Sequence, residues 1–227
     1  MICAAEERFL QMKQGAIFDM DGLMFDTEAM YQAAWNETAA EMGIELPETF
    51  VYEICGTSGD LLRSVIRKYF HTDDPDGLFQ NVLRAVENRL KIEVPVKPGL
   101  FELLACFRAE GVKLAVASSS YPEMIASNLR VSGTETYFDE IVSGSRIEHG
   151  KPAPDIFLYA ADRLHLDPKD CYVFEDSVNG VLAGLAAGCT TVMVPDYVPP
   201  TEEIRNSSAV VCTSLTDALE RIKDGRL

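Results

Sequence analysis

The chain has 227 residues, of which 47% are hydrophobic, so it can bury one domain core and carry an inserted second one. Asp and Glu number 36 against 20 Lys and Arg, which gives a formal net charge of −16. Because such a chain repels a phosphate backbone, no nucleic-acid partner is expected. Any anionic ligand must be met by a metal ion or by a few placed Lys and Arg.

The six cysteines are scattered without a C-x-x-C pair, which favours buried, reduced thiols over a disulfide frame or a zinc site. Residues 1–14 lack the apolar stretch of a signal peptide, and no other run is apolar over the length that spans a bilayer. The sequence therefore predicts a cytoplasmic protein without a membrane partner.

The first predicted element is a short apolar strand at residues 16–18, which ends on Asp19, Asp21 and Gly22. Continuous apolar runs are typical of buried parallel strands, and open α/β sheets gather ligands at the carboxyl ends of such strands. Two residues apart in an extended chain, the two carboxylates point the same way and repel each other. Both stay ionised only beside a cation. Taken alone, the pair also fits a solvated turn.

Residues 28–93 show helical patterns only. Apolar side chains recur at helical spacing over about 29–42, after Pro47, over 61–69 with Ser58 as a candidate N-cap, and over 78–90. Two prolines within residues 94–99 then indicate a linker. We expect residues 28–93 to form an inserted all-helical cap domain.

Beyond this linker, helices and strands alternate. Helices are expected at about 100–110, 122–129, 155–164 and 177–187 and after Ser214, and strands at 112–117, 140–143, 170–174 and 190–194. Alternation of buried strands with helices predicts an α/β fold, a Rossmann-like, doubly wound parallel sheet with helices on both faces. Residues 1–27 and 94–227 would form this catalytic core.

Polar residues accompany the strands of this core in four places: Asp19 and Asp21, then Ser118 and Ser119, then Lys151, and finally Glu175 and Asp176. Singly, each has an ordinary explanation. Ser118 could cap the next helix, Lys151 could be a surface lysine, and the acidic pair could complement a helix dipole. Coincidence does not explain why polar residues accompany the strands in all four places and in this order.

The motifs resemble the haloacid dehalogenase superfamily of phosphohydrolases. Within it, they resemble the branch with a helical cap after the first strand, which includes beta-phosphoglucomutase and many small-metabolite phosphatases. The matching segments are residues 18–23, 26–28, 115–119, 150–154 and 173–177 with Gly180. The resemblance covers nearly the whole chain.

This resemblance implies a role for each motif residue. Asp19 would be the nucleophile that forms an aspartyl phosphate, and Asp21 would act as general acid and then general base. The phosphate would be bound by Ser118, Ser119, Lys151 and the N–H groups of Met20 and Asp21. A magnesium cofactor would be held by Asp19, Glu175, Asp176 and the Asp21 carbonyl, since Mg²⁺ prefers hard oxygen ligands.

The resemblance leaves two enzyme activities open. Beta-phosphoglucomutases carry a His at the position of Tyr31 and an Arg at the position of Gly59. Because this chain lacks both groups, it lacks the cationic clamp that would hold a second phosphate, which favours a phosphatase of a small phosphorylated metabolite. Arg63 or Lys68 could substitute, which keeps the sugar-phosphate mutase as the alternative. A non-enzymatic receiver-like domain is a third reading, disfavoured because its acidic pair would precede the acceptor Asp. The substrate and the oligomeric state stay open, with a monomer as one option.

Overall fold

A computed structural model describes residues 12–55, 57 and 59–227. Within these residues, six parallel strands form one sheet in the order β3-β2-β1-β4-β5-β6. The strands are β1 (Gly15–Phe18), β2 (Lys113–Ser118), β3 (Glu140–Ser143), β4 (Cys171–Glu175), β5 (Thr190–Met193) and β6 (Val210–Val211). This order confirms the doubly wound sheet, and the strand sequence reverses between β1 and β4, where such folds bind ligands.

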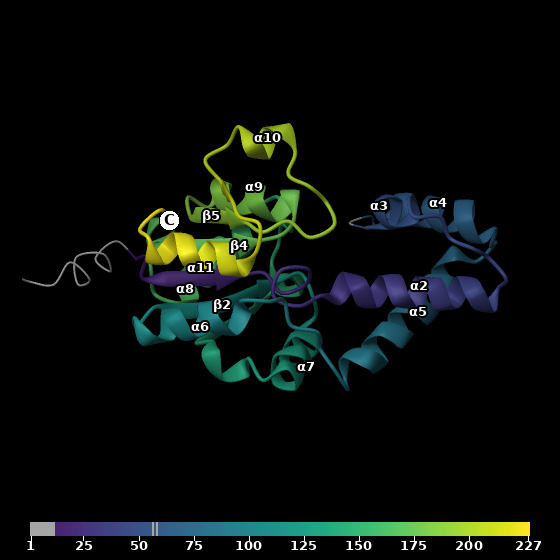
Figure 1. The fold of residues 1–227 in the computed structure, drawn as a ribbon, viewed down its shortest axis with the longest axis horizontal. Helices are drawn as coiled ribbons and strands as arrows, with labels where there is room; N and C mark the ends of the chain where they lie inside the picture. The colour runs from purple at the N-terminus through teal and green to yellow at the C-terminus, as the bar shows by residue number, and fades with distance from the viewer. Residues whose placement is uncertain (1–11, 56, 58) are drawn as a thin grey trace, which may run out of the picture.

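Helices cover both faces of the sheet (Figure 1). On one face lie α6 (Leu100–Ala109), α7 (Pro122–Ser132) and α11 (Leu215–Lys223), and on the other lie α8 (Asp155–Arg163) and α9 (Val178–Ala186). Side chains along β1 alternate between the two hydrophobic clusters, with Phe18 on the first face and Ile17 on the second. Phe18 stacks on Phe174 of β4 with ring centroids 4.7 Å apart. The sheet core is therefore packed directly beneath the strand ends.

Between β1 and α6, the described part of the chain forms four helices, called the cap helices below, which stand to one side of the sheet in Figure 1. They are α2 (Thr27–Glu41), α3 (Phe50–Ile54), α4 (Gly59–Phe70) and α5 (Pro75–Leu90). Trp35 on α2 forms their centre, with its ring centroid 5.8 Å from Phe50, 5.4 Å from Phe70 and 6.2 Å from Phe79. These helices share an aromatic core of their own.

Two chain segments join these helices to the sheet, and they are hydrogen-bonded to each other. The N–H of Asp26 donates to the Pro95 carbonyl at 2.8 Å, and the N–H of Lys97 donates to the Met24 carbonyl at 2.9 Å. The Lys97 ammonium also lies 3.1 Å from Asp26 and 2.7 Å from Asp196, in the loop after β5. The outgoing and returning linkers therefore form one paired connection.

The sequence patterns missed the shortest elements. These are β6, the single-turn α10 (Glu202–Arg205) and the 3₁₀ turns η2 (Glu135–Tyr137), η3 (Gly144–Arg146) and η4 (Pro168–Asp170), which are too short for periodicity to show. Ser214 caps α11 as expected, accepting from the Asp217 N–H at 3.1 Å. The expected N-cap at Ser58 lies outside the described residues, as do residues 1–11 of the segment that was expected to lack a signal peptide.

Two further observations concern the cysteines and the helices. Cys55, Cys106, Cys171, Cys189 and Cys212 are free thiols, while Cys3 lies outside the described residues. Of the helices in the described ranges, none combines the length and the apolar character needed to cross a bilayer.

Candidate active site

Asp19 stands at the carboxyl end of the central strand. Its N–H donates to the Phe174 carbonyl of β4 at 3.0 Å, which continues the sheet pairing by one residue and fixes the side chain above the β1–β4 edge. Gly22, with φ at +85°, turns the chain back, and a Cβ there would lie 2.4 Å from the Asp176 Oδ2. A glycine at this position lets the Asp176 carboxylate approach the loop that carries Asp19 and Asp21.

Lys151 connects the first strand to the fourth. Its Nζ lies 2.5 Å from the Asp19 Oδ1 and 2.5 Å from the Glu175 Oε1, and its side chain is 9% exposed. The other Glu175 oxygen accepts from the N–H and the hydroxyl of Ser177, both at 2.9 Å. A Cβ at Gly180 would overlap the Glu175 carboxylate, so that glycine makes room for it. Glu175 is therefore fully engaged and holds Lys151 toward Asp19.

The charges in this cluster are unbalanced, because Asp19, Asp21, Glu175 and Asp176 face one ammonium group. Burial raises the pKa of Asp19 to about 7, against the attraction of Lys151 and with a further contribution from Glu175. Burial and the repulsion of Glu175 and Asp19 also raise the pKa of Asp176. Burial would lower the pKa of Lys151, but Asp19 and Glu175 outweigh it and raise that pKa. The site thus has an excess of buried negative charge.

Asp21 is held by hydroxyl groups from the end of β2. Its Oδ2 accepts from the Ser120 hydroxyl at 2.8 Å and from the Ser118 hydroxyl at 3.4 Å. Burial raises the pKa of Asp21, although these hydrogen bonds oppose the shift. Ser120, to which we assigned no role from the sequence, thus makes the shorter contact. The run of three serines that begins with the last residue of β2 was the only sequence signal for it.

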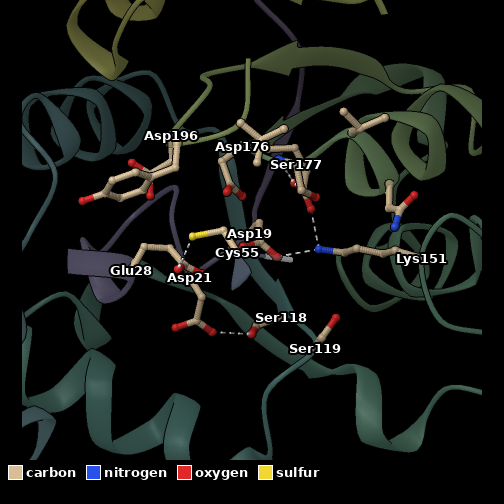
Figure 2. Close-up of a pocket in the computed structure, with 15 residues that line it drawn as sticks. Asp19, Asp21, Glu28, Cys55, Ser118, Ser119, Lys151, Asp176, Ser177 and Asp196 are labelled. Atoms are coloured by element: carbon tan, nitrogen blue, oxygen red, sulfur yellow. Dashed lines mark hydrogen bonds and ion pairs between the residues drawn. The ribbon is translucent and has the colours of Figure 1, made fainter. Parts of the chain in front are cut away.

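A cavity of about 430 Å³ lies above these residues (Figure 2). It is lined by every predicted site side chain, namely Asp19, Asp21, Ser118, Ser119, Lys151, Glu175 and Asp176. Met20 was predicted to contribute only its N–H, and its side chain is fully buried. Additional lining residues not assigned from the sequence are Glu28, Cys55, Ser177, Val178, Asn179, Asp196, Tyr197 and Val198. Asp196 follows β5, and the strand-end rule could have identified it.

The side chains do not form a ready metal cage. Among the described residues, no three His, Cys, Asp or Glu side chains are arranged to hold one ion. The Asp19 Oδ1 and both Glu175 oxygens are engaged by Lys151 and Ser177. Of the three carboxylates Asp19, Glu175 and Asp176, this network leaves the Asp19 Oδ2 and the two oxygens of Asp176 available.

A family model described as haloacid dehalogenase-like hydrolase matches residues 16–194. The chain belongs to this family. The match spans all the motif residues of the site, and it confirms the resemblance inferred from them. Together with the phosphatase relatives described next, this match shows that the haloacid dehalogenase-like hydrolase is an enzyme of the phosphoric monoester hydrolase type.

Several curated relatives of this haloacid dehalogenase-like hydrolase are named as phosphatases. A probable pseudouridine-5'-phosphatase from Drosophila melanogaster is 34% identical over 88% of this chain and 89% of the relative. A phosphorylated carbohydrates phosphatase from Thermotoga maritima is 32% identical over 77% of this chain and 82% of the relative. A fructose-1-phosphate phosphatase from Escherichia coli is 32% identical over 79% of this chain and 95% of the relative.

A solved structure shares the complete architecture. The putative beta-phosphoglucomutase from Thermotoga maritima superposes with a TM-score of 0.79 at 28% identity, covering 93% of this chain and 99% of the other. This likeness confirms the predicted fold class, an α/β core with a helical insertion after β1.

Proposed function

We propose that this hydrolase is a Mg²⁺-dependent phosphatase of a small phosphorylated metabolite, acting in the cytoplasm. The observation that carries the proposal is the contact of Lys151 with both Asp19 and Glu175 inside the cavity. It supports the proposal because a cation, the proposed nucleophile Asp19 and a further acid meet at one point, as phosphoryl transfer requires. The phosphatase names of the relatives support the reaction, and the five free cysteines support a reducing compartment.

The reaction proceeds by two displacements. An Asp19 oxygen attacks phosphorus, the ester P–O bond breaks, and Asp21 gives its proton to the leaving oxygen. Water then attacks the aspartyl phosphate, Asp21 takes a proton from that water, and Asp19 leaves as a carboxylate. The raised pKa of Asp21 suits both steps, because the group must hold a proton in the first and accept one in the second. Lys151 and the Ser118 hydroxyl stabilise charge on the phosphate oxygens.

The donor set fits a magnesium ion. Four carboxylates against one lysine leave an excess of negative charge, which a divalent cation would neutralise. Asp19, Asp176 and the Asp21 carbonyl would hold it. Glu175, which the resemblance also implied as a ligand, has both oxygens engaged and would instead position Lys151 beside the ion. When bound, the ion would polarise the phosphoryl group and offset the charge that develops in the transition state.

The contacts of Arg63 and Lys68 favour the phosphatase over the mutase. Arg63 is paired with Asp76 at 2.9 Å and with Asp60 at 3.0 Å, and Lys68 is paired with Glu53 at 2.5 Å. Neither cation lines the active-site cavity, so neither replaces the missing clamp for a second phosphate. The receiver-like alternative is set aside because the family consists of hydrolases.

Hydrolysis of para-nitrophenyl phosphate tests the proposal. We expect turnover with Mg²⁺, loss of turnover in EDTA, and recovery when Mg²⁺ is restored. Asp21→Asn should retain Mg²⁺ binding in a calorimetric titration and lose activity, because it keeps its main-chain carbonyl but not its proton. Turnover that is unaffected by EDTA would contradict the metal requirement, and the absence of any turnover would contradict the proposed function.

A further inference from the structure

A second hollow of about 290 Å³, lined mostly by the cap helices, adjoins the active-site cavity. Asp21, Glu28 and Cys55 line both spaces. Asp21 is the group that gives a proton to the leaving oxygen, so that oxygen lies where the two spaces meet. The remainder of the substrate therefore extends from the phosphate end of the first cavity into this second hollow, which we call the leaving-group hollow.

The leaving-group hollow has a polar part and an apolar part. Its polar residues are Asp21, Thr27, Glu28, Tyr31, Gln32, Thr57 and Ser120, and the apolar wall includes Trp35, Ile54, Leu62, Phe79, Leu90 and Met124. None of these described lining residues is a cation, and Gly56 and Ser58 on the adjoining segment are uncharged residue types. The polar part offers hydroxyl, amide and carboxylate groups, which are suitable partners for the hydroxyl groups of a substrate.

The available cations are committed elsewhere. Lys151 lies on the opposite side of the cavity from Glu28 and Asp196, as Figure 2 shows, and it is paired with Asp19 and Glu175. Lys97 is paired with Asp26 and Asp196. A second anionic group on the substrate would thus meet carboxylates without a compensating positive charge.

Glu28 is the acid that both spaces share on the cap side. Its Oε2 accepts from the Cys55 thiol at 3.2 Å, and the Gln32 amide donates to the Cys55 sulfur at 3.5 Å. Burial raises the pKa of Glu28, and the charges of Asp196 and Asp21 raise it further, which indicates that this region is already electronegative. Its second oxygen accepts no hydrogen bond from the described residues, so it can accept one from a substrate hydroxyl.

We infer that the leaving-group hollow selects phosphate monoesters whose remainder is uncharged and polyhydroxylated, and that it rejects those carrying a second anionic group. Glu28 is the specificity-determining residue. This inference rests on the proposed phosphatase function and narrows its substrate class. Phosphorylated polyols and neutral sugars fall within the class, and bisphosphates and phosphorylated sugar acids fall outside it.

Matched substrates that differ in charge test this inference. Glucose 6-phosphate is compared with 6-phosphogluconate, and glycerol 3-phosphate with 3-phosphoglycerate, with para-nitrophenyl phosphate as the reference ester. We expect the neutral member of each pair to have a kcat/KM at least about tenfold higher, because a like charge a few ångströms from Glu28 is repelled in this partly buried setting. Glucosamine 6-phosphate, which adds a positive charge, should react no more slowly than glucose 6-phosphate.

A matched pair of variants isolates Glu28. Glu28→Gln should raise kcat/KM for the two carboxylate substrates several-fold relative to their neutral partners. Glu41→Gln removes the same charge from an exposed position at the far end of the same helix, α2, and should leave the ratios unchanged. Thermal unfolding of both variants verifies that they are folded.

The outcomes separate the two proposals. If the carboxylate substrates react as fast as the neutral ones, or if para-nitrophenyl phosphate is hydrolysed and no neutral polyol or sugar phosphate is, the inference is overturned and the phosphatase stands. Unchanged ratios in Glu28→Gln would overturn the role of Glu28. If no phosphate ester reacts, including para-nitrophenyl phosphate, the proposed function itself fails.

Discussion

The two ends of the active-site cavity are built differently. At the sheet end, three charged groups have several partners: Lys151 contacts two carboxylates, Glu175 is bound by Lys151 and twice by Ser177, and Asp21 accepts from two hydroxyls. At the cap end, Glu28 has one contact with a thiol, at 3.2 Å. The charged side chains of Lys151, Glu175 and Asp21 at the sheet end are therefore held by several contacts each, whereas the Glu28 carboxylate at the cap end is held by one.

This difference matches two chemical requirements. Stabilising the transition state of phosphoryl transfer needs groups that are already in place, because reorganisation during the reaction would raise the barrier. Binding the rest of the substrate needs only complementary shape and polarity. Residues at strand ends supply the groups that stabilise the transition state. Residues on the cap helices, which are inserted between two strands, supply the surface that binds the rest of the substrate. A change at the sheet end should therefore alter the rate constant, and a change at the cap end should alter the choice of substrate.

Asp19→Asn is the strongest test of the sheet end. We expect kcat for para-nitrophenyl phosphate to fall by at least about 10,000-fold, because an amide cannot form the acyl phosphate. The variant should stay folded by circular dichroism. Asp73→Asn, at an exposed position, is the control and should keep wild-type kcat. A kcat for Asp19→Asn within tenfold of wild type would refute the covalent route.

Lys151→Met should weaken both catalysis and folding. It leaves the nearly buried carboxylates of Asp19 and Glu175 without their cation, and breaking a buried pair in this way costs roughly 3–5 kcal/mol of unfolding free energy. Urea unfolding at pH 7 in EDTA measures this loss. Lys91→Met, at an exposed position, is the matched control. A loss below about 1 kcal/mol would show that the sheet end does not depend on this ion pair.

Trp35→Ala tests whether the cap helices have a core of their own. Removing a buried Trp should cost about 3 kcal/mol of unfolding free energy, since Phe50, Phe70 and Phe79 lose their common partner. Because Trp35 also lines the leaving-group hollow, KM for sugar phosphates should change more than kcat. Steady-state kinetics below the unfolding midpoint checks this. A large fall in kcat with KM unchanged would contradict the division between the two ends.

The pH dependence of stability gives a smaller effect. The folded pKa of Asp19 is raised from 3.8 to about 7, so the folded state binds the proton more tightly than the unfolded state. This contribution to stability is complete at low pH and is lost as pH rises through about 7. In EDTA, the Tm of the wild type should therefore fall relative to Asp19→Asn between pH 5 and pH 8, by on the order of 5 °C. A difference that is constant with pH would contradict the raised pKa.

The comparison of the two ends also explains how much could be predicted from the sequence. Asp19 and Glu175 end buried strands, and the order of the strands brings such ends together, so the strand pattern predicted the cavity-lining acids. Ser120 was missed because the choice among three adjacent serines depends on side-chain rotamers. Glu28 was not assigned because it reaches the cavity only after the cap helices have packed, and no local pattern encodes that packing. Asp196 follows β5, so the strand-end rule that identified the other acids could also have identified it.

The paired linkers limit how the cap helices could move relative to the sheet. The main-chain hydrogen bonds of Asp26 and Lys97 join the outgoing linker to the returning linker. Rotation of either linker about its own axis would break these hydrogen bonds. Bending of the two linkers together would preserve these hydrogen bonds. Glu28 follows Asp26 by two residues, so any movement of the cap helices about this paired connection would carry Glu28 with them.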